Sequence, residues 1–497
     1  MVKPERTTIA GAFEIPRMLN GLWQLAGGHD TDIDIQIAAN AIDGLVELGL
    51  DGFDMADHYG EAERVIGAYN KKSATPITAF TKWCPPGSGD RSHEQAEKAV
   101  SKAMTRMNSS QIQLMQYHCW DYTDDTYLFN LSHLQSMKHQ GKIAHIGLTN
   151  VDTAHLELLM NSGIAIATNQ VSCSVLDLRL VRGRMASVCA DHGVGVLAYG
   201  TLLGGFLSEK WLHAEEPKHL ESLNWSLRKY LRFIRAAGGW EPFQVLLQAL
   251  SVIAKKHDVS IAAVATRWVL DIPVVSAVIV GCRLNGQSRE YALKNLAAFG
   301  FRLDDDDRQL ISDAQAALQD IPGDCGDEYR RQPFLTAAGD LSHHIRRSDK
   351  KKEIDALLET KQRLEYSSGS KWESVAGYCR AVRVGDRIHV SGTTATPPPG
   401  LVYHAGAIGG KSARSQTVAV LDVIFKAIKE QGGQPKDVVR TRVMVRNEDD
   451  VQQVSEAHGW AFNCEGIRPA NTLTLAGLVG AEFLVEMEAE AVIINMV

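Results

Sequence analysis

Short apolar segments alternate with longer amphipathic segments eight times between about residue 19 and residue 320. The short segments have the length of buried β-strands, and the long ones carry apolar residues at helical spacing. The predicted strands are Leu19–Trp23, Gly52–Ala56, Ile77–Lys82, Ile112–His118, Ala144–Leu148, Ala167–Val171, Val194–Tyr199 and Ser276–Val280. Eight strand–helix units of this kind predict an α/β fold with a closed parallel sheet, the (β/α)8 or TIM barrel.

Two further segments bear on where a ligand binds. Thr7–Pro16 precedes the first strand and has the pattern of a β-hairpin, which we expect to close the bottom of the barrel. The longest connection runs from Gly200 to Ile272 and contains a predicted helix, Glu241–His257. A long connection on the side where strands exit is more often a ligand-covering segment than filler.

The repeat ends near residue 320, and the pattern changes. Residues 336–368 carry a lysine run and a predicted polar helix, Glu353–Leu364, and end in Ser-Ser-Gly-Ser, which is typical of a helical and flexible linker. Strands and helices then mix; the strands are Ala381–Val384, Arg387–Ser391, Val438–Val445, Thr472–Leu475 and Phe483–Val492, and the helices are Ala413–Gln431 and Val451–Asn463. We therefore predict a barrel domain (1–335), a linker (336–368) and a smaller α+β domain (369–497).

Charge and cysteine usage exclude several classes of protein. The 497-residue chain has a formal net charge of −7, which leaves no basic excess for nucleic-acid phosphates. No apolar run approaches the roughly 20 residues of a membrane-spanning helix. The eight cysteines form no Cys-x-x-Cys pair, so reduced thiols are expected rather than a zinc site or a disulfide framework. We expect a cytoplasmic protein that binds neither nucleic acid nor membranes.

Polar side chains stand at the ends of three consecutive predicted strands, where parallel barrels hold their active sites. Asp54 lies at the end of the second strand with Tyr59 in the loop behind it, Lys82 ends the third strand, and His118 ends the fourth. Taken singly, these residues are explained by a barrel-end ion pair, a surface tyrosine and a core histidine. Their occurrence together on consecutive strands favours a catalytic site.

The chemistry of such a site is the protonation of a carbonyl oxygen. A buried lysine ammonium favours the phenolate of a neighbouring tyrosine and so lowers the pKa of that phenol. Asp54 would keep Lys82 charged, and Tyr59 would act as the general acid. His118 would donate a hydrogen bond to the carbonyl oxygen as negative charge develops on it.

The segment Gly52-Phe53-Asp54-Met55-Ala56-Asp57-His58-Tyr59-Gly60 resembles the Asp-x-Ala-x-x-Tyr-Gly signature of the aldo-keto reductases. The resemblance covers residues 7–335 and implies that Asp54, Tyr59, Lys82 and His118 are the catalytic tetrad of that family. It also implies a nicotinamide cofactor that is bound without a Rossmann fold. The implied cofactor contacts are Asn150 and Gln170 for the carboxamide, Gly204, Gly205, Gly281 and Arg283 for the phosphates, and Gln287 and Glu290 for the adenosine.

Three positions bear on the choice of cofactor. Arg283 can pair with a 2′-phosphate, so NADPH is expected rather than NADH. Where the family has an aromatic ring stacked on the nicotinamide, this chain has Cys173, and where an asparagine follows the glutamate, this chain has Tyr291. These two departures concern cofactor affinity and remove no catalytic group.

The C-terminal domain resembles the Rid (YjgF-type) family, which has a chorismate-mutase-like fold. The resemblance rests on residues 387–392, 437–443, 468–472 and 485–489. The family forms trimers with clefts between subunits, so a homo-oligomer, and specifically a trimer through this domain, is expected. Many members hydrolyse imines and enamines to a ketone and ammonia.

Cleft positions of the Rid family fall on Tyr378, Ser391, Glu486 and Asn471. Deaminating members have an arginine at the position of Asn471, where it clamps a substrate carboxylate in a bidentate pair, and a neutral amide cannot do this. Three roles therefore stay open for the domain. They are deamination of an imino acid, binding of another ligand, and a purely structural role in forming the trimer.

The expected function is the NADPH-dependent reduction of an aldehyde or ketone, a small-molecule carbonyl substrate, to an alcohol. One alternative is an NADPH-binding regulatory or interaction subunit with little turnover. Another is an alcohol or sugar dehydrogenase that runs in the oxidative direction. Trp23, Trp83 and Trp120 would favour an aromatic or apolar substrate if they line the pocket, and core packing explains each of them equally well.

Overall fold

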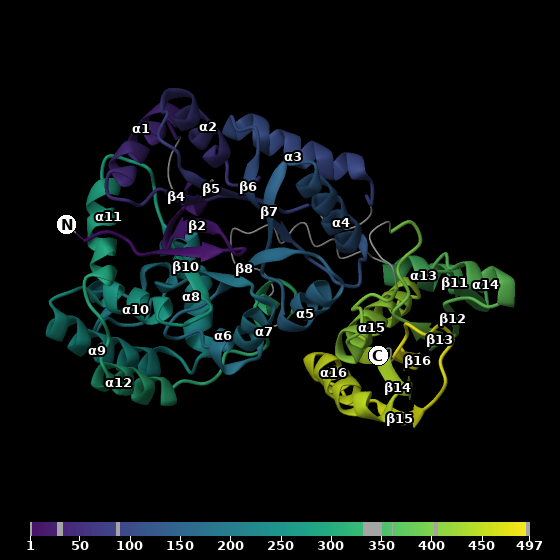
Figure 1. The fold of residues 1–497 in the computed structure, drawn as a ribbon. Coiled ribbons are helices and arrows are strands. Elements are labelled where there is room, and N and C mark those ends of the chain that lie inside the picture. Colours follow the sequence, from purple (N-terminus) through teal and green to yellow (C-terminus); the bar gives the residue numbers. More distant parts are fainter. Residues whose placement is uncertain are drawn as a thin grey trace.

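A closed barrel of eight parallel strands forms the first part of the chain (Figure 1). The structure, a computed structural model, describes residues 2–26, 33–85, 90–331, 350–359, 361–401 and 406–493. The barrel strands are β3 (Met18–Gly21), β4 (Gly52–Asp54), β5 (Thr78–Trp83), β6 (Ile112–His118), β7 (Ile143–Thr149), β8 (Ile166–Ser172), β9 (Gly195–Tyr199) and β10 (Val275–Gly281). The ring closes where β10 pairs with β3 and with β9, which confirms the predicted fold class.

Helices surround the barrel and pack apolar side chains against its strands (Figure 1). They include α1 (Ile35–Val46), α2 (Ala62–Lys72), α3 (His93–Met107), α4 (Thr126–His139), α5 (Thr153–Asn161), α7 (Met185–His192), α10 (Ile261–Leu270), α11 (Ser288–Leu296) and α12 (Asp305–Ala316). Side chains of Asp34, Ser92, Asp152 and Ser260 accept hydrogen bonds from the first turns of α1, α3, α5 and α10. Such N-caps fix where each loop ends and its helix begins.

A β-hairpin closes the bottom of the barrel, as the sequence predicts. It consists of β1 (Arg6–Ile9) and β2 (Phe13–Pro16), which pair in antiparallel register, and in Figure 1 it lies across the ring of strands. Ile9 and Ile15 are buried against Leu19, Phe80 and other apolar side chains of the barrel interior. This plug leaves the opposite end, where the strands exit, for chemistry.

The long connection between β9 and β10 is folded rather than an open loop. It contains the short turns η2 (Leu203–Gly205), η3 (Glu209–Trp211) and η4 (Leu220–Ser222), and the helices α8 (Trp225–Ala236) and α9 (Trp240–His257). Phe206, Leu231 and Phe243 are buried in a second apolar cluster with side chains of α10 and α12. The segment therefore has a core of its own, which holds it over the strand ends.

A mixed six-stranded sheet with the order β11-β12-β13-β16-β14-β15 forms the C-terminal domain. Its strands are β11 (Arg363–Tyr366), β12 (Ala381–Val384), β13 (Arg387–Thr394), β14 (Val438–Val445), β15 (Ala470–Leu475) and β16 (Val485–Val492). Its helices are α13 (Lys350–Leu358), α14 (Lys371–Ala376), α15 (Ala413–Glu430) and α16 (Val451–Cys464). Among the described residues, no helix combines the length and the apolar character needed to cross a membrane.

The sheet begins earlier than the predicted domain. β11 pairs with β12 in antiparallel register, although its residues fall in the range predicted as a linker. The predicted helix Glu353–Leu364 corresponds to α13, which ends at Leu358, and Leu364 is instead a buried residue of β11. A four-residue strand with one buried side chain has too little alternation to stand out in a polar sequence.

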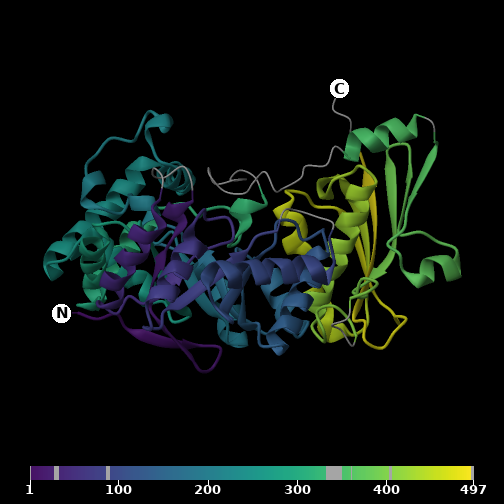
Figure 2. The same cartoon turned by 90° about the horizontal axis from the view of Figure 1, so that it is seen from above.

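The two domains meet through α5 of the barrel and α15 of the C-terminal domain. Figure 2 shows α15 between the barrel and the sheet. Polar contacts across this interface include Gly409 N to Ser162 Oγ at 2.8 Å, Asn161 Nδ2 to Ser415 Oγ at 2.9 Å and His155 Nε2 to Asp422 Oδ2 at 3.1 Å.

Candidate active site

A buried ion pair joins two neighbouring strands at the open end of the barrel. Asp54 is the last residue of β4, and Lys82 lies near the end of β5. Lys82 Nζ is 2.5 Å from Asp54 Oδ2 and also donates a hydrogen bond to the backbone oxygen of Met55 at 2.9 Å. Both side chains are at most 4% exposed, so each buried charge depends on the other.

Two glutamines inside the barrel orient the carboxylate of Asp54. Gln116 on β6 and Gln170 on β8 each donate a hydrogen bond to Asp54 Oδ1 at 2.8 Å. Gln170 also donates to Gln116 Oε1 at 2.7 Å, so the residue expected to hold a carboxamide here belongs to the network around Asp54. Gln116 was not predicted from the sequence; its signal was an amide within an apolar strand, where a buried polar group needs partners.

Tyr59 lies directly beside this network. Lys82 Nζ is 5.0 Å from the centre of the Tyr59 ring, and the ring of Trp23 packs edge-on at 4.9 Å. Burial, followed by the negative charge of Asp54, raises the pKa of Tyr59 well above its ordinary value. The predicted lowering of this pKa by Lys82 is wrong, because Asp54 neutralises the ammonium at close range and burial penalises a phenolate. Tyr59 is therefore held as a protonated phenol.

His118 is a buried side chain whose hydrogen-bonding capacity is unused. It is 3% exposed, and neither ring nitrogen has a hydrogen-bond partner among the described residues. Its ring packs against Trp120 at 4.0 Å and Tyr329 at 5.3 Å. Burial and the nearby charge of Arg330 lower the pKa of His118 well below its usual value, so the imidazole is neutral. A buried polar group without a partner costs about 1–3 kcal/mol, which a bound acceptor would relieve.

One cavity of about 580 Å³ connects these groups with most of the expected cofactor residues. Its walls include Asp54, Tyr59, Lys82 and His118, together with Asn150, Gln170, Gly204, Gly205, Gly281, Arg283 and Gln287. Glu290 is not among the lining residues. Its exposed carboxylate instead pairs with Lys294 on the same helix, at 2.8 Å. Cys173 is fully buried in the core and does not line the cavity, whereas Tyr291 does.

The geometry of two positions in the cavity wall requires glycine. Gly205 has φ of +110°, and a Cβ built there would meet nothing within 4 Å. Gly281 approaches Gln24 so closely that a Cβ would lie 2.3 Å from its Nε2 atom. Arg283 also lines the cavity, and its guanidinium suits the phosphate groups of a ligand. The residues present therefore fit a dinucleotide cofactor.

Lys229 and Tyr329 also belong to the cavity wall, although neither was predicted from the sequence. Lys229 Nζ on α8 donates a hydrogen bond to the hydroxyl of Tyr329 at 2.8 Å and lies 5.0 Å from the ring centre of Tyr199. Tyr329 belongs to η6 (Asp327–Tyr329), which follows the last barrel helix and carries no motif. Trp23 and Trp120 line the cavity, whereas Trp83 packs against Tyr117 in the core.

Comparison with known proteins assigns the barrel. A model of the "Aldo/keto reductase family" matches residues 17–316, more than half of the chain. The chain belongs to this family. Aldo/keto reductases are NAD(P)H-dependent oxidoreductases, so the barrel is one as well, and the resemblance expected from the sequence is confirmed.

Relatives of the reductase domain have low sequence identity, but the matches cover most of their length. The chloroplastic pyridoxal reductase of Arabidopsis thaliana is 26% identical over 330 residues, which are 60% of this chain and 82% of that protein. The NADH-specific methylglyoxal reductase of Escherichia coli is 26% identical over 330 residues, which are 61% of this chain and 96% of that protein. The solved glycerol dehydrogenase of Gluconobacter oxydans shares the fold at 22% identity, with a TM-score of 0.52 over 64% of this chain and 97% of its own.

The C-terminal domain matches a second family. A model named "Endoribonuclease L-PSP", the family of the Rid proteins, matches residues 369–493. The Rid resemblance is therefore confirmed, and the chain is a fusion of an aldo/keto reductase with a Rid domain.

The structure brings together three of the four expected cleft residues of the Rid domain. Arg380 donates hydrogen bonds to the Ser391 and Gly392 backbone oxygens and packs against Tyr378. Gly392 lies so close to Glu486 that a Cβ would meet its carboxylate at 2.3 Å. Asn471 is on β15, separated from β13 by β16 and β14, or roughly 14 Å at strand spacing. Its Nδ2 donates to Thr441 Oγ1 at 2.9 Å.

Proposed function

We propose that the barrel reduces an aldehyde or ketone to an alcohol, with NADPH as the hydride donor and Tyr59 as the proton donor. The observation that carries this proposal is the buried, neutral His118, whose two nitrogens have no described partner and which shares a cavity with the phenol of Tyr59. A buried hydrogen-bond donor without an acceptor suits a carbonyl oxygen that gains negative charge.

Each polar group has a separate task in this proposal. The nicotinamide supplies a hydride to the carbonyl carbon when it is bound. Tyr59 donates its phenolic proton to the carbonyl oxygen, and His118 donates a hydrogen bond to the same oxygen. The ammonium of Lys82, 5.0 Å from the Tyr59 ring centre, stabilises the negative charge left on the phenolate. Asp54, fixed by Gln116 and Gln170, keeps the ammonium in place.

NADPH is proposed over NADH because of Arg283 in the cavity wall. A guanidinium pairs with a phosphate in a bidentate geometry that a ribose hydroxyl cannot match. Asn150, Gly204, Gly205, Gly281 and Gln287 would hold the remaining parts of the cofactor.

The walls of the cavity favour a substrate with an apolar or aromatic body. Trp23, Trp120 and Trp225 line it, and their rings offer a large apolar contact area to a substrate. The pyridoxal and methylglyoxal reductases among the relatives make these two aldehydes the first substrates to test.

For the Rid domain we propose oligomerisation, as a trimer, or the handling of an imine-related ligand. The separation of Asn471 from Tyr378, Ser391 and Glu486 within one chain favours an assembly role, because a cleft between subunits would reunite these positions.

The test is the variant Tyr59→Phe, assayed by NADPH consumption with pyridoxal, methylglyoxal and aromatic aldehydes. Removal of the proton donor is expected to lower kcat by about 100-fold or more while the Kd for NADPH changes little. Tyr127→Phe is the control, since Tyr127 is a buried tyrosine that lies outside the cavity. A Tyr59→Phe enzyme that keeps most of its rate, or a wild-type protein that binds NADPH without turnover, would refute the proposal.

A further inference from the structure

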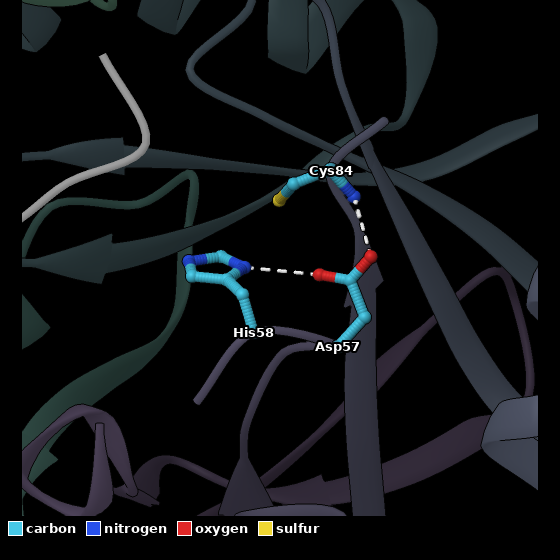
Figure 3. Close-up of side chains that lie close together, drawn as sticks. All are labelled: Asp57, His58 and Cys84. Carbon is cyan, nitrogen blue, oxygen red and sulfur yellow. Dashed lines mark hydrogen bonds and ion pairs between the residues drawn. The ribbon is translucent and has the colours of Figure 1, made fainter. Parts of the chain in front are cut away.

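Three side chains of the kinds that bind transition metals lie together at the cavity. A carboxylate oxygen of Asp57, a ring nitrogen of His58 and Sγ of Cys84 are all within 4.8 Å of one another. Figure 3 shows the Asp57 carboxylate between the imidazole of His58 and the backbone of Cys84. This is the only group of three or more His, Cys, Asp or Glu residues with such spacing in the part of the chain that the structure describes.

Backbone contacts fix the cluster in place. Asp57 N donates a hydrogen bond to the Lys82 backbone oxygen at 3.1 Å, and Arg106 donates to the Asp57 backbone oxygen at 3.1 Å. The Asp57 carboxylate accepts hydrogen bonds from Cys84 N at 3.2 Å and from His58 Nδ1 at 2.9 Å. These hydrogen bonds connect two loops, one after β4 and one after β5. The three candidate ligand side chains therefore need little reorganisation to bind an ion.

We propose that Asp57, His58 and Cys84 bind a borderline-soft divalent cation, with Zn²⁺ as the best match, and that this ion inhibits the reductase. Thiolate, imidazole and carboxylate together suit Zn²⁺, whereas Mg²⁺ and Ca²⁺ prefer oxygen ligands alone. Tetrahedral Zn²⁺ with ordinary bond lengths separates its ligand atoms by about 3.3–3.6 Å. Atoms no more than 4.8 Å apart reach this spacing by side-chain rotation.

The charges of the cluster also match a divalent ion. A thiolate and a carboxylate together carry two negative charges, and the neutral imidazole adds none. When the ion binds Nδ1 of His58, the imidazole proton moves to Nε2, so the ring stays neutral, and the thiol proton of Cys84 is released to solvent. The neighbouring ammonium of Lys82 is neutralised by Asp54 at 2.5 Å, which limits its repulsion of a second cation.

The position of the cluster explains why an ion here would inhibit. His58 and Cys84 line the cavity, and the His58 ring meets the Tyr59 ring edge-on at 4.8 Å. An ion at this point, with its fourth coordination position open, occupies space next to the phenol that must reach the carbonyl oxygen. The spacing of cysteines in the sequence gives no hint of such a site, because its ligands come from two loops 26 residues apart.

Cobalt binding tests the site without reference to activity. The full chain, freed of metal with a chelator, is titrated with Co²⁺ and then with Zn²⁺. We expect one tightly bound Co²⁺ per chain, with visible bands of tetrahedral cobalt and a near-ultraviolet thiolate-to-cobalt band that Zn²⁺ abolishes. Cys84→Ser and His58→Gln are expected to weaken binding at least about tenfold. Cys189→Ser, which removes a buried thiol of α7 far from the cluster, should bind like the wild type.

Two results would overturn the proposal. The first is a wild-type protein without a thiolate-to-cobalt band, or a band that persists in Cys84→Ser. The second is a reductase whose rate of NADPH consumption Zn²⁺ does not lower reversibly, or an inhibiting Zn²⁺ concentration that rises less than about tenfold in Cys84→Ser. Inhibition of each protein is measured relative to its own rate without Zn²⁺. If no reductase activity exists, the proposed function fails, while the cobalt spectrum still decides whether the site binds metal.

Discussion

Arg283 is the residue on which the preference between the two nicotinamide cofactors depends. Replacing it by alanine removes a charge-assisted pair worth roughly 1.5–3 kcal/mol, so the KM for NADPH is expected to rise about 10- to 100-fold. The KM for NADH should change little, since NADH lacks the 2′-phosphate. Arg289→Ala is the control, because Arg289 pairs with Glu47 outside the cavity. Equal losses with both cofactors would show that Arg283 does not select between them.

The site residues that the sequence identifies are those placed by strand periodicity. Asp54, Lys82 and His118 could be assigned because consecutive parallel strands end at one rim. Lys229 and Tyr329 could not, because a helix in the long connection and a turn beyond the last barrel helix bring them to the cavity. The neutralisation of Lys82 by Asp54, which leaves Tyr59 protonated, depends on distances that no sequence pattern contains.

At the scale of elements, helices α5 and α15 enclose a charged histidine. His155 on α5 is buried between Asp152 at 2.7 Å and Asp422 of α15 at 3.1 Å, and it stacks on Tyr122 at 3.4 Å. Burial alone would lower the pKa of His155, but the two carboxylates outweigh it and raise the pKa to about 9. A positive charge thus ties the barrel to the C-terminal domain.

This contact predicts a pH-dependent stability. Because the folded pKa of about 9 exceeds the ordinary 6.5, the stabilisation is complete below pH 6.5 and is lost as pH rises through 9. The shift corresponds to about 3 kcal/mol. Relative to wild type, His155→Phe should lower the unfolding temperature clearly at pH 6 and much less at pH 9.5. His139→Phe, on the exposed side of α4, is the control. A deficit that does not depend on pH would contradict the charged bridge.

Regular elements could be predicted closely where their periodicity is strong. Ile112–His118 and Val438–Val445 have the predicted bounds, because their apolar spacing is unbroken. β11 and α14 were missed, since both are short and carry few buried side chains. The helix α8 lies where only a covering segment was expected. Contacts from α9, α10 and α12 stabilise it, and these arise only after folding.

At the scale of the whole molecule, the C-terminal domain forms ion pairs with two segments that border the cavity. Lys429 of α15 pairs with Asp121, which directly follows Trp120 of the cavity wall. Arg331, two residues after Tyr329, pairs with Glu465 beyond α16. The Rid domain therefore contacts the two segments that carry Trp120 and Tyr329, whose rings pack against His118.

Assembly is the property that we expect the Rid domain to control. Light scattering of the full chain is expected to give three times the chain mass, and a chain cut after residue 349 is expected to give a lower multiple. The cut precedes α13 and β11, because β11 belongs to the sheet. NADPH binding by the shortened chain serves as the control that the barrel is folded. If both proteins contain the same number of chains per particle, assembly depends on the barrel instead.

Hydride transfer itself is the event from which the roles of Tyr59 and His118 follow. NADPH carrying deuterium at the transferred position of its nicotinamide is incubated with the full chain and an aldehyde such as pyridoxal, and the alcohol is examined by mass spectrometry. We predict one deuterium on the former carbonyl carbon, formed at the rate at which NADPH disappears. An alcohol without the label, or no alcohol across the whole substrate panel, would contradict the assignment of this cavity as a carbonyl reductase site.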